Sequence, residues 1–196
     1  MLKKLGATGF QIDLSQRPQI DQLKKELQNQ TRELDALIHN AASVSDRTIQ
    51  NMEEPDWSKV IETDLSSVYY LTKKFLSFLF KKPGSKILTI VSRVGLRGGF
   101  GEANYAAAKG GLISLTKTLA QELGRKEILV NALNPGFMKS KMTESIPEKV
   151  YQNNIEESVL KTISEPERVS NFMIYLLSDL FPKVSGQIFH LDSRRT

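Results

Sequence analysis

The 196-residue sequence predicts an α/β fold in which a parallel sheet carries helices on both faces. Short apolar runs typical of buried strands alternate with longer segments whose apolar residues recur at helical spacing. Turn residues follow several of these runs directly, as in Asn134-Pro135-Gly136. No internal repeat, linker or low-complexity stretch divides the chain. A single domain over residues 1–196 is therefore expected.

The first half of the chain contains two candidate strands and two candidate helices. Residues 9–13 form a short extended run, and Leu37-Ile38 belongs to a brief apolar strand that leads into His39. Residues 18–30 carry apolar side chains at helical spacing. Residues 56–80 predict a long helix, whose apolar face comprises Trp57, Val60, Ile61, Leu65, Val68, Leu71 and Phe75.

The second half repeats this alternation. Buried strands are expected at residues 86–92, 128–133 and 186–192. A glycine-rich loop at residues 95–101 separates the first of these strands from an alanine-rich helix at residues 103–123. The motif Ser164-Glu-Pro-Glu167 predicts a capping box that starts a helix ending at Leu177.

The composition argues against several classes of protein. The absence of cysteine removes disulfides and thiolate metal sites and fits a reducing, cytoplasmic location. Two histidines leave little for a zinc site, so no metal is expected. No apolar run predicts a membrane span or a secretory signal. The net charge of +5 comes from scattered lysines without interleaved aromatic residues, which favours solvated helix faces over nucleic-acid binding.

Three residues point to carbonyl chemistry. Tyr105 and Lys109 are four apart on a predicted helix and share a face. Ser92 ends the preceding strand, at the edge where open α/β sheets bind ligands. A nearby ammonium lowers a tyrosine pKa by about one to three units, so Lys109 is expected to help Tyr105 act as an acid. Ser92 is expected to hold a carbonyl oxygen while Tyr105 protonates it.

The sequence around these residues resembles that of a known protein family. Two runs resemble the short-chain dehydrogenase/reductase family, and most closely its 3-oxoacyl-[acyl-carrier-protein] reductases: SRVGLRGGFGEANYAAAKGGLISLTKTLAQEL and ILVNALNPGF. The resemblance covers nearly the whole chain. It implies a Rossmann-like fold, an NAD or NADP cofactor, and an oxidoreductase. Such an enzyme reduces a carbonyl, for example a 3-oxoacyl thioester, or oxidises the corresponding alcohol.

The resemblance also implies roles for individual residues. Ser92, Tyr105 and Lys109 match the catalytic serine, tyrosine and lysine, and Lys109 would also bind the nicotinamide ribose. The remaining cofactor contacts implied are Asp13 at the adenine, Asn40, Ala41 and Ala42 beside the adenosine half, Pro135, Gly136 and Phe137 under the nicotinamide, and Ser140 at the carboxamide or phosphate.

The resemblance implies partners as well. Arg125 and Lys126 match a basic contact to the acidic acyl carrier protein, with a solvated surface charge as an equal alternative. A homo-oligomer through the helices at residues 56–80 and 103–123 is expected.

The chain departs from the family pattern at Asp64. The family has an asparagine here, in a Val-x-x-Asn-Leu setting, whereas this chain reads Val60-Ile-Glu-Thr-Asp64-Leu65. An ionised aspartate only accepts hydrogen bonds, and its charge opposes the lowering of the Tyr105 pKa. We expect slower catalysis with an alkaline-shifted pH profile, the alternative being a harmless pairing with Lys109 or water. Ala42 also replaces a glycine of the family.

The family's glycine-rich phosphate-binding turn finds no match. Gly6-Ala7-Thr8-Gly9 follows only five residues and leads into a predicted strand, so it is interpreted as a turn. The first βαβ portion is therefore expected to be missing from a truncated chain, and the choice between NAD and NADP is unreadable. Either the chain is a fragment or mis-started reading frame, or residues 9–13 pair directly with the strand before Asn40. The functional alternatives are an impaired oxidoreductase and a non-catalytic oligomerisation or interaction protein.

Overall fold

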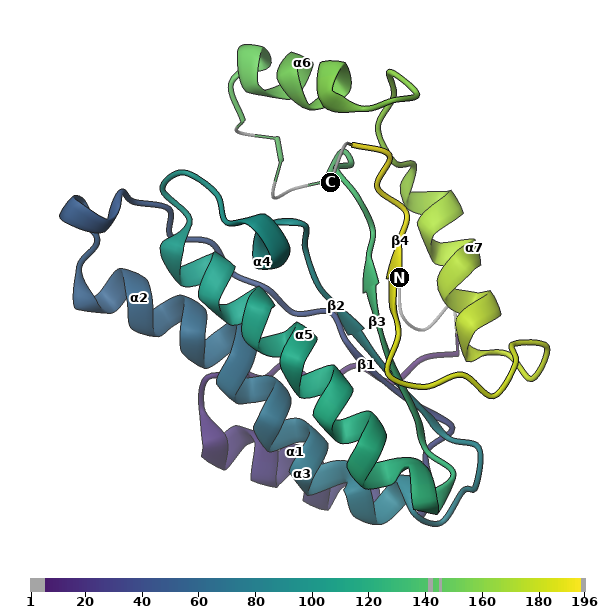
Figure 1. Cartoon of the computed structure of the whole chain (residues 1–196). Coiled ribbons are helices and arrows are strands. Elements are labelled where there is room, and N and C mark those ends of the chain that lie inside the picture. The colour runs from purple at the N-terminus through teal and green to yellow at the C-terminus, as the bar shows by residue number, and fades with distance from the viewer. Residues whose placement is uncertain (1–5, 141–142, 145, 195–196) are drawn as a thin grey trace.

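A four-stranded parallel sheet forms the centre of the computed structural model, which describes residues 6–140, 143–144 and 146–194 (Figure 1). The strand order follows the chain: β1 (Ala36–His39), β2 (Lys86–Ile90), β3 (Leu129–Asn134) and β4 (Ile188–His190). In the register, Leu37 of β1 lies beside Ile87 of β2, which lies beside Val130 of β3. Because side chains alternate along a strand, these three share one face of the sheet.

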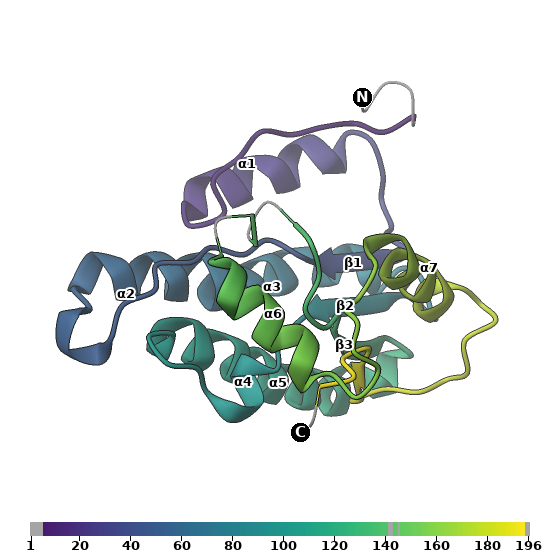
Figure 2. The ribbon, with the colours of Figure 1, turned by 90° about the horizontal axis from the view of Figure 1, so that it is seen from above.

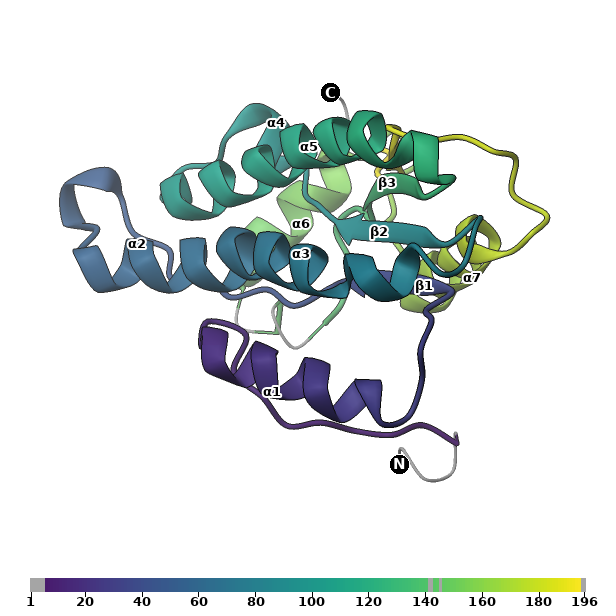
Figure 3. The same cartoon turned by 90° about the horizontal axis from the view of Figure 1, so that it is seen from below.

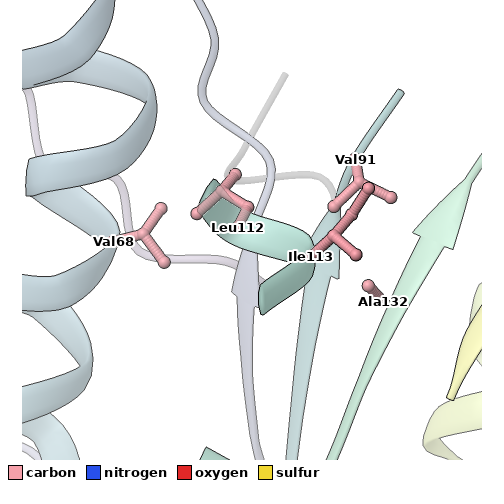
Figure 4. Packing of buried hydrophobic residues seen from close by; sticks show 5 residues of the cluster. All are labelled: Val68, Val91, Leu112, Ile113 and Ala132. Carbon is pink, nitrogen blue, oxygen red and sulfur yellow. The ribbon is translucent and has the colours of Figure 1, made fainter. Parts of the chain in front are cut away.

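Two long helices cover that face. One runs without a break through α2 (Glu54–Ile61), a π-helical turn (Glu62–Ser66) and α3 (Ser67–Leu79). The other is α5 (Ala103–Leu123), which coincides with the expected helix. Figure 4 shows where they meet the sheet, in a cluster of Val68, Val91, Leu112, Ile113 and Ala132. A second cluster joins Leu79 and Leu123 to Ile87, Ile128 and Val130.

The opposite face is covered by α7 (Pro166–Leu177). Leu88 of β2 and Leu133 of β3 pack there against Val169 and Leu176. Helices therefore cover both faces of a parallel sheet, which confirms the predicted Rossmann-like α/β fold. None of the helices in the described ranges is long and apolar enough to cross a bilayer.

The helix α1 (Arg17–Gln28) lies beyond the β1 edge of the sheet, where Figures 2 and 3 show it beside α3. Its buried Ile20 joins a cluster with Leu71, Phe75 and Phe78 of α3. Leu37 of β1 also packs against this cluster. The apolar face predicted for this helix is therefore confirmed.

Residues 9–13 are not a strand, which corrects one expectation. They also do not pair with β1, whose outer edge has no strand partner among the described residues. The reason is local hydrogen bonding. The Asp13 N–H donates to Gln19 Oε1, and the Asp13 carboxylate accepts from the Ser15 N–H and hydroxyl. These groups build the turn that precedes α1 and leave the segment outside the sheet.

The predicted capping box of α7 is also wrong. The cap residue is Glu165, and no side chain caps it. Ser164 instead donates from its hydroxyl to the Leu191 carbonyl, and from its N–H to the Phe137 carbonyl. It therefore ties together the segments that follow β3 and β4.

Four short elements complete the described structure. The glycine-rich loop contains a helix, α4 (Val94–Arg97), and α6 (Glu148–Glu157) precedes α7 in the chain. Two 3-10 turns lie at Ile49–Asn51 and Gly124–Lys126.

Gly95 offers a test of the contact between α4 and α5. A Cβ atom at Gly95 would lie 2.6 Å from the backbone carbonyl carbon of Lys109, whereas one at Gly124 would meet open space. Gly95→Ala should therefore destabilise the protein by about 1–3 kcal/mol in urea unfolding. Gly124→Ala, the matched control, should leave stability unchanged or raise it by about 0.4–1 kcal/mol. Equal losses in both variants would contradict the close approach.

Candidate active site

The predicted triplet comes together at the carboxyl edge of the sheet. Ser92 follows β2, and Tyr105 and Lys109 lie in the first two turns of α5. Ser92 Oγ accepts a hydrogen bond from the Val94 N–H at 3.2 Å, and the Ser92 side chain lies near enough to Tyr105 to lower the pKa of the phenol. Gly95 allows α4 to approach α5 at Lys109, which holds the Ser92 loop against this helix.

A buried ion pair joins Lys109 of the triplet to Asp64. Lys109 Nζ is 3.2 Å from Asp64 Oδ2, with side-chain exposures of 3% and 0%. Lys109 Nζ also donates to the Ile90 carbonyl at 3.4 Å, and Asp64 Oδ1 accepts from the Ser43 N–H at 2.7 Å. Asp64 lies in the π-helical turn between α2 and α3. Single π turns in long helices commonly mark functional sites.

Burial and pairing oppose each other in this ion pair. Burial raises the pKa of Asp64, while Lys109 and the Ser43 N–H lower it. Burial lowers the pKa of Lys109, and Asp64 opposes that shift. Each charge thus stabilises the other where water does not reach.

Tyr105 is not activated by Lys109 in this structure, contrary to the expectation from the sequence. Burial, together with the negative charges of Asp64 and Glu102, raises the pKa of Tyr105 to about 12, and the nearby Ser92 side chain only partly opposes this rise. Because Asp64 neutralises the lysine, little net positive charge acts on the phenol. The opposing effect expected of Asp64 has the predicted direction.

The turns proposed to hold a cofactor follow the two neighbouring strands. Asn40, Ala41 and Ala42 follow β1 and are exposed or half-buried. Pro135, Gly136 and Phe137 follow β3. Since these strands are parallel to β2, both turns emerge at the same edge as Ser92.

The turn after β3 is tightly constrained. Gly136 has a φ of +80°, and a Cβ there would lie 2.4 Å from Ser164 Oγ. Its N–H donates to Asn134 Oδ1 at 3.2 Å. The Phe137 ring packs edge-on against Tyr151 of α6. Ser140, three residues further on, donates from its N–H to Thr143 Oγ1.

Other predicted residues are not brought to this centre. The Asp13 carboxylate is engaged by Ser15, within the turn before α1. Arg125 and Lys126 lie at the far end of α5 from Tyr105. At 1.5 Å per residue, that separation is about 30 Å along the helix axis.

Two contacts at the site were not predicted from the sequence. One is the Ser43 N–H on Asp64, a backbone group that no residue pattern reports. The other is Arg93, which pairs with Glu157 of α6 at 2.8 Å. The only sequence signal for the second was the position of Arg93 directly after Ser92. The buried His39 bonds to Thr72 Oγ1, and burial lowers its pKa to about 4, so it stays neutral and structural.

The described residues suit the nicotinamide half of an NAD(P) cofactor better than its pyrophosphate. Lys109, Tyr105 and the turn after β3 provide polar and backbone groups at one edge. A pyrophosphate cradle would need a glycine-rich turn between a strand and a helix N-terminus. In the described part of the chain, α1 instead follows a segment without strand structure.

Comparison with known proteins places this geometry in a family. The family model described as enoyl-(acyl carrier protein) reductase matches residues 1–193. The chain belongs to the short-chain dehydrogenase/reductase family. Members of this family are NAD(P)-dependent oxidoreductases.

Its similar relatives include three bacterial proteins named 3-oxoacyl-[acyl-carrier-protein] reductase FabG. The chain is 33% identical to that of Thermotoga maritima over 183 residues, which are 93% of this chain and 74% of the relative. It is 35% identical to that of Buchnera aphidicola subsp. Schizaphis graminum, over 97% of this chain and 78% of the relative. The Escherichia coli K12 protein is 32% identical over 96% of this chain and 78% of the relative. This short-chain dehydrogenase/reductase thus spans about three quarters of these relatives.

Asp64→Asn tests the electrostatics of the site. Without the negative charge at position 64, tyrosinate is no longer repelled and the positive charge of Lys109 is no longer neutralised. The pKa of Tyr105 should therefore fall from about 12 toward its ordinary value. The pKa can be followed through tyrosine ring-carbon resonances in an NMR pH titration, with Tyr105→Phe to assign the signal. Asp35→Asn, which removes an exposed carboxylate paired with Lys82, is the control and should leave the pKa of Tyr105 unchanged. An unchanged or higher pKa in Asp64→Asn would refute this account.

Proposed function

We propose that this chain is a carbonyl reductase, or the corresponding alcohol dehydrogenase, in which Tyr105 is the general acid. The observation that carries the proposal is the placement of Ser92 at the end of β2 beside α5, which presents Tyr105 and Lys109 on one face. Ser92 holds the substrate oxygen, and Tyr105 donates a proton to that oxygen. A nicotinamide cofactor, when bound, supplies the hydride.

Lys109 orients the site in this proposal. It binds the ribose of the cofactor, and it lies 5.3 Å from the Tyr105 ring centroid. Asp64 holds Lys109 in place, but its negative charge neutralises the lysine and so reduces the effect of Lys109 on the Tyr105 phenol. Tyr105 is therefore a weak acid, and carbonyl reduction is slow. The reverse oxidation of an alcohol, which needs tyrosinate as the base, is slow near neutral pH and speeds up at higher pH.

The cofactor contacts proposed are those on the described turns. Pro135, Gly136 and Phe137 support the nicotinamide, and Ser140 contacts its carboxamide or a phosphate. Asn40, Ala41 and Ala42 lie beside the adenosine half, with Asp13 at the adenine. Since the described residues include no phosphate cradle ahead of β1, we expect weak binding of NAD or NADP by the single domain of residues 1–196.

The names of the relatives make a 3-oxoacyl thioester the first substrate to test. The chain would then act in fatty acid biosynthesis. Arg125 and Lys126 are exposed, as a contact with an acidic acyl carrier protein requires. Because they lie far from Tyr105 along α5, they would have to serve the active site of another copy. We propose a homo-oligomer through α2, α3 and α5.

A non-catalytic interaction protein is the second candidate. It is favoured by the segment before α1, which provides no strand for a phosphate cradle. It is also favoured by exposed aromatic side chains on the α2–α3 helix, Trp57 and Tyr69.

Cofactor titration separates the two candidates. NADPH and NADH should each be titrated against the chain by calorimetry, and their oxidation followed with acetoacetyl thioester. The reductase proposal expects measurable binding, and a rate that falls by about 10²–10⁴-fold in Tyr105→Phe with the cofactor affinity unchanged. An absence of binding at millimolar cofactor would reject catalysis by this chain and favour the interaction protein.

A further inference from the structure

Arg93 occupies an unusual place beside the candidate catalytic residues. It directly follows Ser92, and their Cα atoms are about 3.8 Å apart across one peptide bond. It lies in the loop between β2 and α4, at the carboxyl edge where all three of the described site turns emerge. The proposed chemistry at Ser92 and Tyr105 makes no use of this charge.

The guanidinium group of Arg93 is only half satisfied. Its Nη2 donates to Glu157 Oε2 at 2.8 Å. Its Nη1 is buried from solvent, yet it has no hydrogen-bond partner among the described residues. Buried polar groups are normally hydrogen-bonded, so an unpartnered arginine nitrogen needs an explanation.

A carboxylate is the ligand that this arrangement fits. The two terminal nitrogens of a guanidinium form a planar fork that binds both oxygens of a carboxylate. Glu157 is fixed to the end of α6 and reaches only one of the two nitrogens. A carboxylate that is free of the backbone can bond to Nη1 and Nη2 together.

Glu157 is a replaceable partner. Its side chain is 55% exposed, and none of the described side chains of α6 is buried. The charge of Arg93 also acts to lower the pKa of two other carboxyl groups, those of Glu102 and Asp192. Asp192 is already held by Arg194, and the burial of Glu102 favours its neutral form. Neither carboxyl group is hydrogen-bonded to the free Nη1 nitrogen.

We infer that Arg93 is a specificity-determining residue that binds a carboxylate on the carbonyl substrate, at the position that the Glu157 carboxylate fills in the free protein. The substrate class is a short oxo acid whose carboxylate lies a few bonds from the reacting carbonyl. This inference rests on the proposed carbonyl reduction at Ser92 and Tyr105, and it assigns that site a substrate class other than the 3-oxoacyl thioester, which carries no free carboxylate.

The test compares oxo acids with their neutral methyl esters. Pyruvate, acetoacetate and 4-oxopentanoate are titrated by calorimetry, each against its ester, with and without NADPH. At least one acid should bind tenfold or more tightly than its ester. Arg93→Met should abolish that preference, while Arg168→Met, which removes an exposed arginine on α7, should retain it.

Glu157→Gln gives an independent readout if Arg93→Met fails to fold. It removes the competing charge from an exposed position and should tighten acid binding severalfold without affecting the esters. Equal binding of acids and esters, or no binding of either, would overturn the inference, as would a preference that survives Arg93→Met. The result is separable from the proposed function, which fails instead if the chain binds no cofactor or reduces no carbonyl, whatever its preference among these ligands.

Discussion

The buried ion pair between Lys109 and Asp64 is the interaction on which the site depends. An isolated buried charge is strongly destabilising, so neither residue could stay ionised at this depth without the other. The pair and its hydrogen bonds join α5, the π-helical turn, the end of β2 through the Ile90 carbonyl, and the segment after β1 through the Ser43 N–H. One charge pair therefore fixes the relative positions of four segments that surround the proposed active site.

The same pair limits the proposed chemistry. A lysine lowers the pKa of a neighbouring tyrosine only if its own charge is uncompensated. Here Asp64 compensates Lys109, and the pKa of Tyr105 rises with burial. The aspartate thus stabilises the arrangement of the residues at the expense of proton donation. Arg93, the residue after Ser92, also carries a positive charge and pairs with the exposed carboxylate of Glu157.

The sequence was sufficient to predict the fold and the placement of Ser92, Tyr105 and Lys109 at one edge of the sheet. Strands and helices around Ser92, Tyr105 and Lys109 follow from strong apolar periodicity, and the parallel sheet brings their ends to one edge. It was not sufficient for residues 9–13, where short-range hydrogen bonds decide the structure. It also did not reveal that Ser164 bonds to segments distant in the chain instead of capping a helix. The consequences of Asp64 depended on burial and on a backbone N–H, which no sequence pattern reports.

A double-mutant cycle on the ion pair tests the central claim most directly. The free energy of unfolding is measured for Asp64→Asn, Lys109→Met and the double variant, with the exposed pair Asp35 and Lys82 as a reference cycle. Each single change at the buried pair should cost about 3–5 kcal/mol, because it leaves one charge uncompensated. The double variant should cost less than the sum by about 0.5–3 kcal/mol, and the reference pair should couple by about 1 kcal/mol or less. Additive losses at Asp64 and Lys109 would contradict the claim that this pair holds the site together.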